Sequence, residues 1–286
     1  MRIGERHLEE LRVRGFTVVE DFVGGDDLRA AQEGVLLDHP SPAALFDDAE
    51  LQRRYGRSQF AGLRYGPASS FAVNRLAFHP DLVDLAERFL GSPDLHLYKI
   101  ELWAKYSGLV DYDQTHHRDF ANHSIVVPDA RRPWAQLTTF ILLSDVTEQD
   151  GPTKVVPLEH SAGLPLWPER LDAGAFADVE VSITGPAGTL FAYRTDVFHR
   201  GSSMTGERRH RSAMLADYQL WGTRWAGKIA WPNQALNRGW TELIVRASPR
   251  ERCLFGFPAP GDDYWTEQTR ADVTRRYPGI DLSTYA

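Results

Sequence analysis

The segment QTHHRDF places a histidine, His117, two residues before a carboxylate, Asp119. In an extended chain, side chains two residues apart point to the same side, so both groups can reach one metal ion while Arg118 points away. Two imidazoles and one carboxylate form a facial site that suits Fe(II) and leaves the other coordination positions open for O₂ and a second small molecule. The pair therefore needs one more histidine, from a distant part of the chain.

The third ligand that we predict is His199, in the segment DVFHRG. It follows the run GTLFAY, which has the composition of a strand, and it precedes a turn of Gly and Ser. An isolated His-x-Asp triplet also occurs by chance at surface turns, so the pair gains weight only together with the rest of the pattern. His116 would lie on the opposite face of the strand, where we expect a packed or hydrogen-bonded role.

An arginine-rich segment, RRHRSAML, lies a short distance after His199. This spacing predicts that one strand carries the histidine and that its neighbour carries an arginine. A guanidinium at that place would pair with the far carboxylate of a dicarboxylate whose other end chelates the metal, because guanidinium binds carboxylate through two parallel hydrogen bonds. Arg211, Arg208 and Arg209 are the candidates.

The elements that must position these residues are short apolar runs rich in β-branched and aromatic residues, separated by Gly, Pro and Asp. They predict a mainly β core, an antiparallel sandwich or barrel of the jelly-roll (cupin-like, double-stranded β-helix) type, whose mouth can hold a site. The runs are 95–106, 134–146, 153–158, 178–185, 188–201 and 211–221.

Helical periodicity flanks this core and predicts a helical shell. The expected helices are 5–13, 26–37, 81–91, 234–248 and 262–277, with one strand at 16–21. No repeat or linker divides the sequence, so we expect a single domain over residues 1–286. It would have a helical part at about 1–95, a β core at about 96–222 and a helical tail at about 223–286.

Composition excludes several classes of protein. The formal net charge is -7, and the basic residues are dispersed, which argues against a nucleic-acid partner. No apolar run is long enough to cross a membrane, and the N-terminal segment has no apolar core of the secretory type. The one cysteine, Cys253, allows no internal disulfide. We therefore expect a cytoplasmic protein with a small-molecule partner, and the pattern specifies no oligomeric state.

The order of these motifs resembles the phytanoyl-CoA dioxygenase family of iron and 2-oxoglutarate enzymes, which also includes ectoine hydroxylases. The resemblance runs over about residues 10 to 225, from LHLYKIELWAKY through HRDF, GPTKVVPLEHSAG, GTLFAYRTDVFHRGSS and RSAMLADY. One departure is the family's VPGSH loop, in which Leu158 and Glu159 replace the Gly-Ser pair.

The resemblance implies a role for each matching residue. Fe(II) would be held by His117, Asp119 and His199, and 2-oxoglutarate by Arg211, with Arg208 and Arg209 as alternatives. Two hydroxyl residues, Thr138 and Ser202, resemble those that line the co-substrate pocket. From their positions near Asp119, Phe120 and His123 are candidates to face the substrate.

The resemblance also implies the reaction. In halogenating relatives a small residue replaces the carboxylate ligand, whereas here Asp119 is present, which favours hydroxylation or a related oxidation. We expect a dioxygenase that oxidises an unactivated C–H bond of a small molecule, such as a secondary-metabolite intermediate or amino-acid derivative, and that releases succinate and CO₂. The alternatives are a non-enzymatic cupin-type protein that binds a small ligand or metal, and an iron enzyme that works without 2-oxoglutarate.

Overall fold

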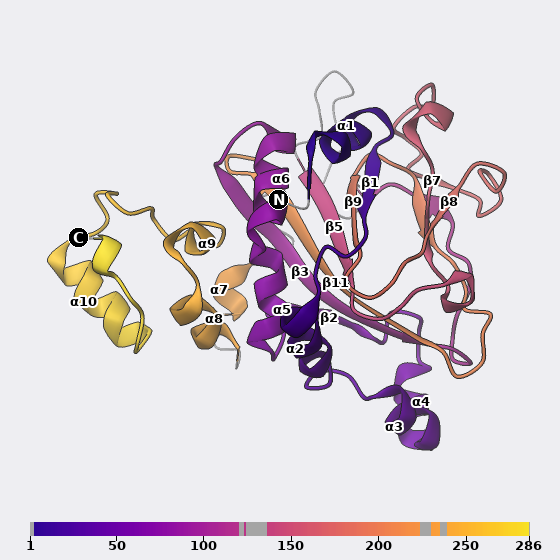
Figure 1. Cartoon of the computed structure of the whole chain (residues 1–286), viewed down its shortest axis with the longest axis horizontal. Helices are drawn as coiled ribbons and strands as arrows, with labels where there is room; N and C mark the ends of the chain where they lie inside the picture. Colours follow the sequence, from indigo (N-terminus) through magenta and orange to yellow (C-terminus); the bar gives the residue numbers. More distant parts are fainter. Residues whose placement is uncertain (1–2, 120–122, 124–135, 224–229, 235–238, 286) are drawn as a thin grey trace.

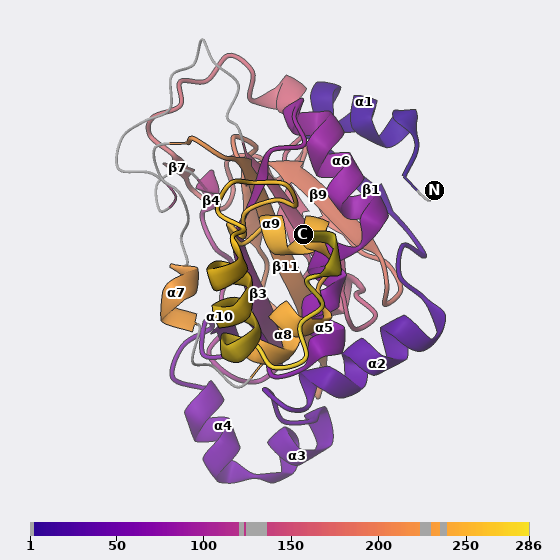
Figure 2. The same ribbon diagram turned by 90° about the vertical axis from the view of Figure 1, so that its left-hand side faces the viewer.

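A computed structural model describes residues 3–119, 123, 136–223, 230–234 and 239–285. Two antiparallel sheets form its centre, with helices on one side (Figures 1 and 2). This architecture confirms the predicted jelly-roll core. None of the helices in the described ranges is both long enough and apolar enough to span a bilayer.

The larger sheet has six strands in the order β1-β9-β5-β11-β3-β2. The bounds are β1 Phe16–Val19, β9 Leu190–Arg194, β5 Gln136–Leu142, β11 His210–Leu220, β3 Leu95–Tyr106 and β2 Leu63–Tyr65. Its two longest strands, β3 and β11, pair along their whole length, with Arg211 opposite Lys105 and Leu215 opposite Glu101. These two strands therefore form the central pair of long strands in the larger sheet.

The smaller sheet has five short strands in the order β7-β4-β10-β6-β8. The bounds are β7 Arg170–Leu171, β4 His116–His117, β10 His199–Gly201, β6 Thr153–Val155 and β8 Val181–Ile183. Two neighbouring strands, β4 and β10, each carry one of the predicted histidine ligands. The smaller sheet therefore aligns residues that lie far apart in the sequence.

Helices surround the larger sheet, most of them on the side away from β7 and β8 (Figure 1). They are α1 Glu5–Val13, α2 Gly25–Val35, α3 Pro42–Asp47, α4 Ala49–Tyr55, α5 Phe71–Arg75, α6 Pro80–Leu90, α7 Trp231–Gln234, α8 Trp240–Arg246, α9 Pro249–Cys253 and α10 Glu267–Arg276. Helix α6 begins with Pro80 at its first turn and ends at Gly91, whose φ of 78° is a backbone conformation that glycine adopts at low cost. The end that the sequence predicts for this helix is confirmed.

Side chains alternate across β11 and β3, and this alternation separates an apolar core from the interior of the sandwich. Met214, Ala216 and Tyr218 pack with the helices in the main core, together with Ile100 and Leu102 of β3. The residues between them point the other way, towards the smaller sheet. That face carries the polar groups described below.

Several predicted strands are shorter than expected or are divided in the structure. The run 188–201 divides into β9 and β10, because the amide of Val197 donates to the carbonyl of Arg194 and closes a turn between them. The guanidinium of Arg194 also pairs with Asp196 inside this turn, at 2.6 Å. The run 178–185 shortens to β8. The polar residues Arg194, Thr195 and Asp196 mark this turn in the sequence.

Candidate active site

The predicted triad converges in the structure. His117 and His199 lie opposite each other in the register of β4 and β10, with ring centroids 4.5 Å apart. Asp119 approaches both rings, at 3.9 Å from Nε2 of His117 and 3.4 Å from Nε2 of His199. One ligand atom from each residue lies within 4.8 Å of the other two. Strand pairing therefore brings together residues that are far apart in sequence.

Backbone contacts prepare both imidazoles to bind a metal. Nδ1 of His117 is 2.9 Å from the carbonyl of Thr115, and Nδ1 of His199 is 3.2 Å from the carbonyl of Val197. Since a carbonyl only accepts, each Nδ1 carries the proton and donates it, which leaves the lone pair on Nε2. Nε2 of His117 and Nε2 of His199 both lie on the side of Asp119. All three residues can therefore bind the same ion.

The charges at the site also fit a cation. Burial lowers the pKa of His199 to about 4, so its imidazole is neutral near pH 7, which is the form that binds metals. Burial opposes ionisation of Asp119, but the surrounding imidazoles and Lys99 outweigh it and hold the pKa well below its ordinary value. Two imidazoles and one carboxylate are a donor set that suits Fe(II).

Asp119 is oriented by a tyrosine of the larger sheet. The hydroxyl of Tyr193 donates to Oδ2 of Asp119 at 2.8 Å and lies 3.4 Å from Nε2 of His199. Tyr193 is 1% exposed, and its ring stacks on Phe191 with centroids 4.9 Å apart. A buried hydroxyl on a rigid strand therefore fixes the orientation of the carboxylate.

We expect Tyr193→Phe to weaken Fe(II) binding by about 10- to 100-fold, because it removes the hydrogen bond that orients a ligand and keeps the ring stack. Anaerobic titration of Fe(II) against a competing chelator measures this affinity. The matched control is Tyr218→Phe, which removes a buried hydroxyl that donates instead to the carbonyl of Ala77. Equal Fe(II) affinity in both variants would contradict the role given to Tyr193.

The ligand segment is less extended than the sequence predicts. Strand β4 ends at His117, and Asp119 lies beyond it. Arg118 does point away from the site: its guanidinium donates to the carbonyls of Asp196 and Pro165 and lies 4.0 Å from the ring centroid of Phe198. These bonds hold the turn that brings Asp119 back to the two histidines.

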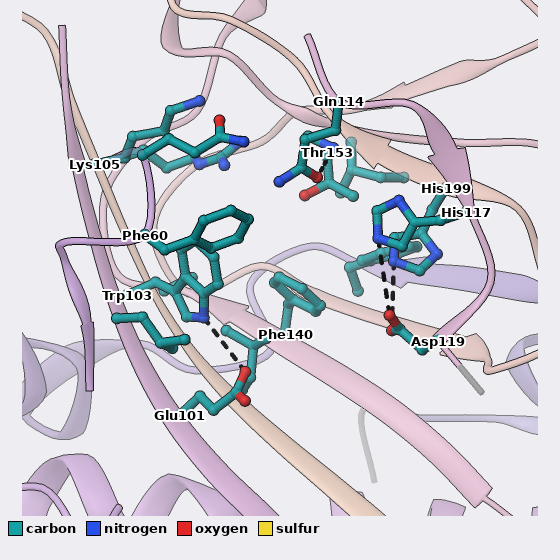
Figure 3. A pocket seen from close by; sticks show the side chains of 18 of the residues that line it. Phe60, Glu101, Trp103, Lys105, Gln114, His117, Asp119, Phe140, Thr153 and His199 are labelled. Carbon is teal, nitrogen blue, oxygen red and sulfur yellow. Dashed lines mark hydrogen bonds and ion pairs between the residues drawn. The ribbon is translucent and has the colours of Figure 1, made fainter. Parts of the chain in front are cut away.

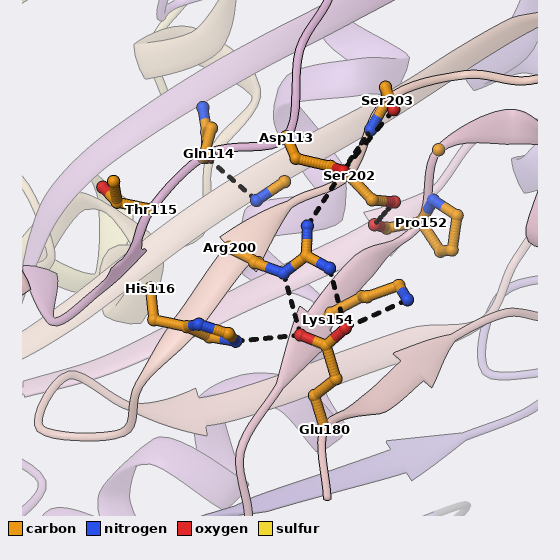
Figure 4. Close-up of polar contacts among 12 residues, drawn as sticks. Asp113, Gln114, Thr115, His116, Pro152, Lys154, Glu180, Arg200, Ser202 and Ser203 are labelled. Carbon is orange, nitrogen blue, oxygen red and sulfur yellow. Dashed lines mark hydrogen bonds and ion pairs between the residues drawn. The ribbon is translucent and has the colours of Figure 1, made fainter. Parts of the chain in front are cut away.

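Glu180 joins the strands behind the triad (Figure 4). Its Oε2 contacts Nε2 of His116 at 2.8 Å, and both of its oxygens accept from the guanidinium of Arg200 at 2.7 and 2.8 Å. Lys154 adds a third contact at 3.1 Å. His116 precedes one ligand and Arg200 follows another, so one carboxylate ties β4, β10 and β6 together. His116 is hydrogen-bonded, as expected, and is not part of the triad.

We expect Glu180→Ala to lower the free energy of unfolding by about 3 kcal/mol, because it removes the carboxylate that Arg200, Lys154 and His116 share. Contacts with Arg200, Lys154 and His116 outweigh burial and lower the pKa of Glu180 from 4.5 to about 2. Its contribution is therefore complete above pH 4.5 and is lost as the pH falls towards 2.

Urea denaturation at several pH values measures both effects. The control Glu242→Ala breaks an exposed pair with Arg246 and should cost less than about 1 kcal/mol. Equal losses of unfolding free energy in the two variants would show that the contacts behind the triad do not stabilise the fold.

A cavity of about 730 Å³ opens beside the triad. His117, Asp119 and His199 form part of its wall, and Arg211 of the larger sheet forms another part. Figure 3 shows the triad on one side, with Phe140 on the floor between it and Trp103. A volume of this size accommodates small molecules.

Of the three candidate arginines, only Arg211 lines this cavity within the described residues. Its Nη1 donates to the carbonyl of Gly151. Burial lowers its pKa to about 10, so the guanidinium remains charged near neutral pH. Arg209 is paired with Asp150 at 2.8 Å, and Arg208 with Asp47 at 2.9 Å.

One prediction about the arginine is wrong. Arg211 does not lie on a strand next to that of His199, because β10 belongs to the smaller sheet and β11 to the larger. The chain crosses from one sheet to the other between Gly201 and His210. Arg211 therefore lies on the sheet opposite His199, across the interior of the sandwich.

The other predicted site residues have different positions. Thr138 donates to Asp217 at 3.1 Å and Ser202 to the carbonyl of Pro152 at 2.7 Å, and neither lines the cavity as described. Both hydroxyls are committed to internal hydrogen bonds, so we leave them out of the co-substrate site. His123 is buried and lines the cavity, with Nδ1 3.1 Å from Oε1 of Gln136. Phe120 lies outside the described residues.

The sequence analysis missed a row of residues on β3. Lys99, Glu101, Trp103 and Lys105 all line the cavity. Their signal is the alternation in KIELWAK, where polar or aromatic residues occupy every second position of an otherwise apolar strand. Tyr193 was also not predicted, because a single tyrosine within an apolar strand is expected to pack in the hydrophobic core.

Comparisons with known proteins agree with this geometry. The model of the phytanoyl-CoA dioxygenase (PhyH) family matches residues 11–212. An L-proline trans-4-hydroxylase from Streptomyces griseoviridis is 28% identical over 175 residues, which cover 50% of this chain and 61% of that protein. This chain therefore spans about three fifths of the length of that relative.

Solved structures share the fold. The non-heme alpha ketoglutarate dependent epimerase SnoN from nogalamycin biosynthesis superposes with a TM-score of 0.58 at 21% identity, covering 76% of this chain and 80% of that one. The apoform of EctD from S. alaskensis gives a TM-score of 0.58 at 22% identity, covering 78% and 79%. Together with the family match over most of the sequence, these findings show that this chain belongs to the phytanoyl-CoA dioxygenase family.

Proposed function

We propose that this protein is an Fe(II)- and 2-oxoglutarate-dependent dioxygenase that hydroxylates a C–H bond of a small molecule. The observation that carries the proposal is the arrangement around the cavity. Nε2 of His117, Nε2 of His199 and the carboxylate of Asp119 converge on one point, and a buried guanidinium faces the same space from the opposite sheet. A structural metal site would be closed by a further protein ligand and would not need that cation.

Each residue has a defined task in this proposal. His117, Asp119 and His199 hold Fe(II), and Arg211 pairs with the distal carboxylate of 2-oxoglutarate. The carbonyl of Gly151 takes one of the guanidinium protons and so holds the arginine in position. Bound iron, with 2-oxoglutarate and O₂, supplies the oxidising power, and succinate and CO₂ are released. The protein contributes position, charge and exclusion of water.

Hydroxylation is favoured over halogenation because Asp119 occupies the position of the carboxylate ligand. The hydroxyl of Tyr193 reinforces this ligand, which leaves no room at that position for a halide. One of the relatives, the L-proline trans-4-hydroxylase, is named as a hydroxylase. Solved structures with this fold also include an epimerase and a carbocyclase, both alpha ketoglutarate dependent.

His123 is proposed to face the substrate. Its ring is buried in the cavity wall and lies against Tyr98, with centroids 5.1 Å apart. A histidine held in this way presents a fixed edge to a bound molecule. It stands close enough to Asp119 to affect the pKa of that carboxyl.

Two measurements test the proposed function. Anaerobic addition of Fe(II) and 2-oxoglutarate should produce the weak visible charge-transfer band of the chelate, and a panel of small molecules should reveal substrate-stimulated succinate formation. A cupin-type binding protein would give neither signal. An iron enzyme that works without 2-oxoglutarate would oxidise its substrate without forming succinate. Absence of the band with Fe(II) bound would refute the proposal.

A further inference from the structure

A second carboxylate, Glu101, lies in the cavity away from the triad (Figure 3). It is in the middle of β3 and only 4% exposed. Its Oε2 accepts from the indole N–H of Trp103 at 3.4 Å and lies 3.3 Å from Nζ of Lys99. Oε1 takes part in neither contact, and none of the described residues adds another. A buried carboxylate thus faces the cavity with one oxygen available.

Glu101 shares its cationic partner with a second buried carboxyl group. Nζ of Lys99 also lies 3.5 Å from Oδ2 of Asp217. One ammonium therefore stands between two carboxyl groups. Burial and the charges of Glu101 and Asp119 together raise the pKa of Asp217 to about 7, against the opposing effect of Lys99. Lys99 is therefore not reserved for Glu101, whose second oxygen remains directed at the cavity.

Three aromatic side chains share the cavity with Glu101. Trp103 and Phe60 form an edge-to-face pair with centroids 5.5 Å apart, and Tyr65 lies opposite Glu101 in the register of β2 and β3. All three line the cavity. Phe60 and Tyr65 are 44% and 48% exposed, so they lie at its open side. Ring faces attract cations, most strongly those already removed from water.

We infer that the substrate carries a protonated amine, bound by Oε1 of Glu101 between the rings of Phe60, Trp103 and Tyr65. That the bound amine is the substrate rests on the proposed function. That the cavity binds an amine at Glu101 does not. A carboxylate and a set of aromatic rings are complementary to an alkylammonium group and repel an anion. The amine site would fix which C–H bond of the molecule faces the triad.

The competing explanation is that Glu101 only compensates Lys99 inside the protein. In that case a neutral molecule of the same shape would bind as well as a cation. Binding experiments with benzylammonium, benzyl alcohol and benzoate separate the two explanations, because the three probes share one ring and differ in charge.

Isothermal titration calorimetry of the metal-free full chain measures binding of each probe. We expect the chain to prefer benzylammonium over benzyl alcohol by about tenfold and to bind benzoate most weakly. Glu101→Gln should lose this preference. The variants Asp119→Asn and Glu242→Gln, which remove a different carboxylate of the cavity and an exposed one, should keep it. Equal binding of the three probes, no binding of benzylammonium, or a preference lost in Asp119→Asn would overturn the inference.

If Glu101→Gln fails to fold, the wild-type chain still shows whether the ammonium group binds at Glu101. Benzylammonium must shift the indole N–H resonance of Trp103, assigned by comparison with Trp103→Phe, and benzyl alcohol must leave it in place. His117→Ala separates this inference from the proposed function. It should lose Fe(II) binding and keep the preference for benzylammonium, so that either proposal can fail without the other.

Discussion

Replacing His117 or Asp119 by alanine should abolish substrate-dependent formation of succinate. Each substitution removes one of three ligands, and the two that remain cannot hold a metal with the same three positions filled. The loss should exceed that of any other variant, because the ligands hold the group that performs the oxidation. Succinate release and Fe(II) affinity, measured on the same preparations, should fall together.

Two exposed residues provide matched controls for this experiment. His160 and Asp178 are both exposed, and neither lies in the cavity wall. His160→Ala and Asp178→Ala should leave turnover and Fe(II) binding unchanged. Undiminished turnover in both His117→Ala and Asp119→Ala would refute the assignment of the iron site.

Replacing Arg211 by alanine should raise the concentration of 2-oxoglutarate needed for half-maximal rate by roughly 10- to 100-fold. The substitution removes a charge-assisted contact worth about 1.5 to 3 kcal/mol. Arg211→Lys should lie between alanine and wild type, since it keeps the charge and loses the two-pronged hydrogen bond. Initial rates of succinate formation against 2-oxoglutarate, at saturating substrate, measure the effect.

The neighbouring arginines, Arg208 and Arg209, test whether Arg211 is the arginine that binds 2-oxoglutarate. Arg208 pairs with Asp47 and Arg209 with Asp150, both outside the cavity wall. Arg208→Ala and Arg209→Ala should therefore leave the requirement for 2-oxoglutarate as it is. If one of these two variants raised it and Arg211→Ala did not, the anchor of the co-substrate would be misassigned.

The effects expected for the iron ligands and for Arg211 also depend on the residues that hold the two sheets in place behind the cavity. Tyr193 holds Asp119 from the larger sheet, while Glu180 joins the strands on either side of the histidines. These contacts connect the two sheets to one site. Small shifts of either sheet would therefore change the ligand geometry before they unfold the protein.

The sequence by itself determined the local features of this protein. His117 and Asp119 are two residues apart, so any turn or strand keeps them close. Strand β3 could be read from its apolar and aromatic composition, and the end of α6 from Gly91, because both follow from the conformational preferences of a few adjacent residues. The choice of His199 as the third ligand came from its place after the run GTLFAY, and the resemblance of the motif order to a known family supported it.

Only the tertiary structure decided which distant groups meet. The pairing of β4 with β10 sets His199 opposite His117, and the passage of the chain between sheets places Arg211 across the interior. The shared contact of Lys99 with Glu101 and Asp217 also arises between strands. Such contacts depend on the register of long-range strand pairing, which many short apolar runs satisfy equally well until the whole sandwich is packed.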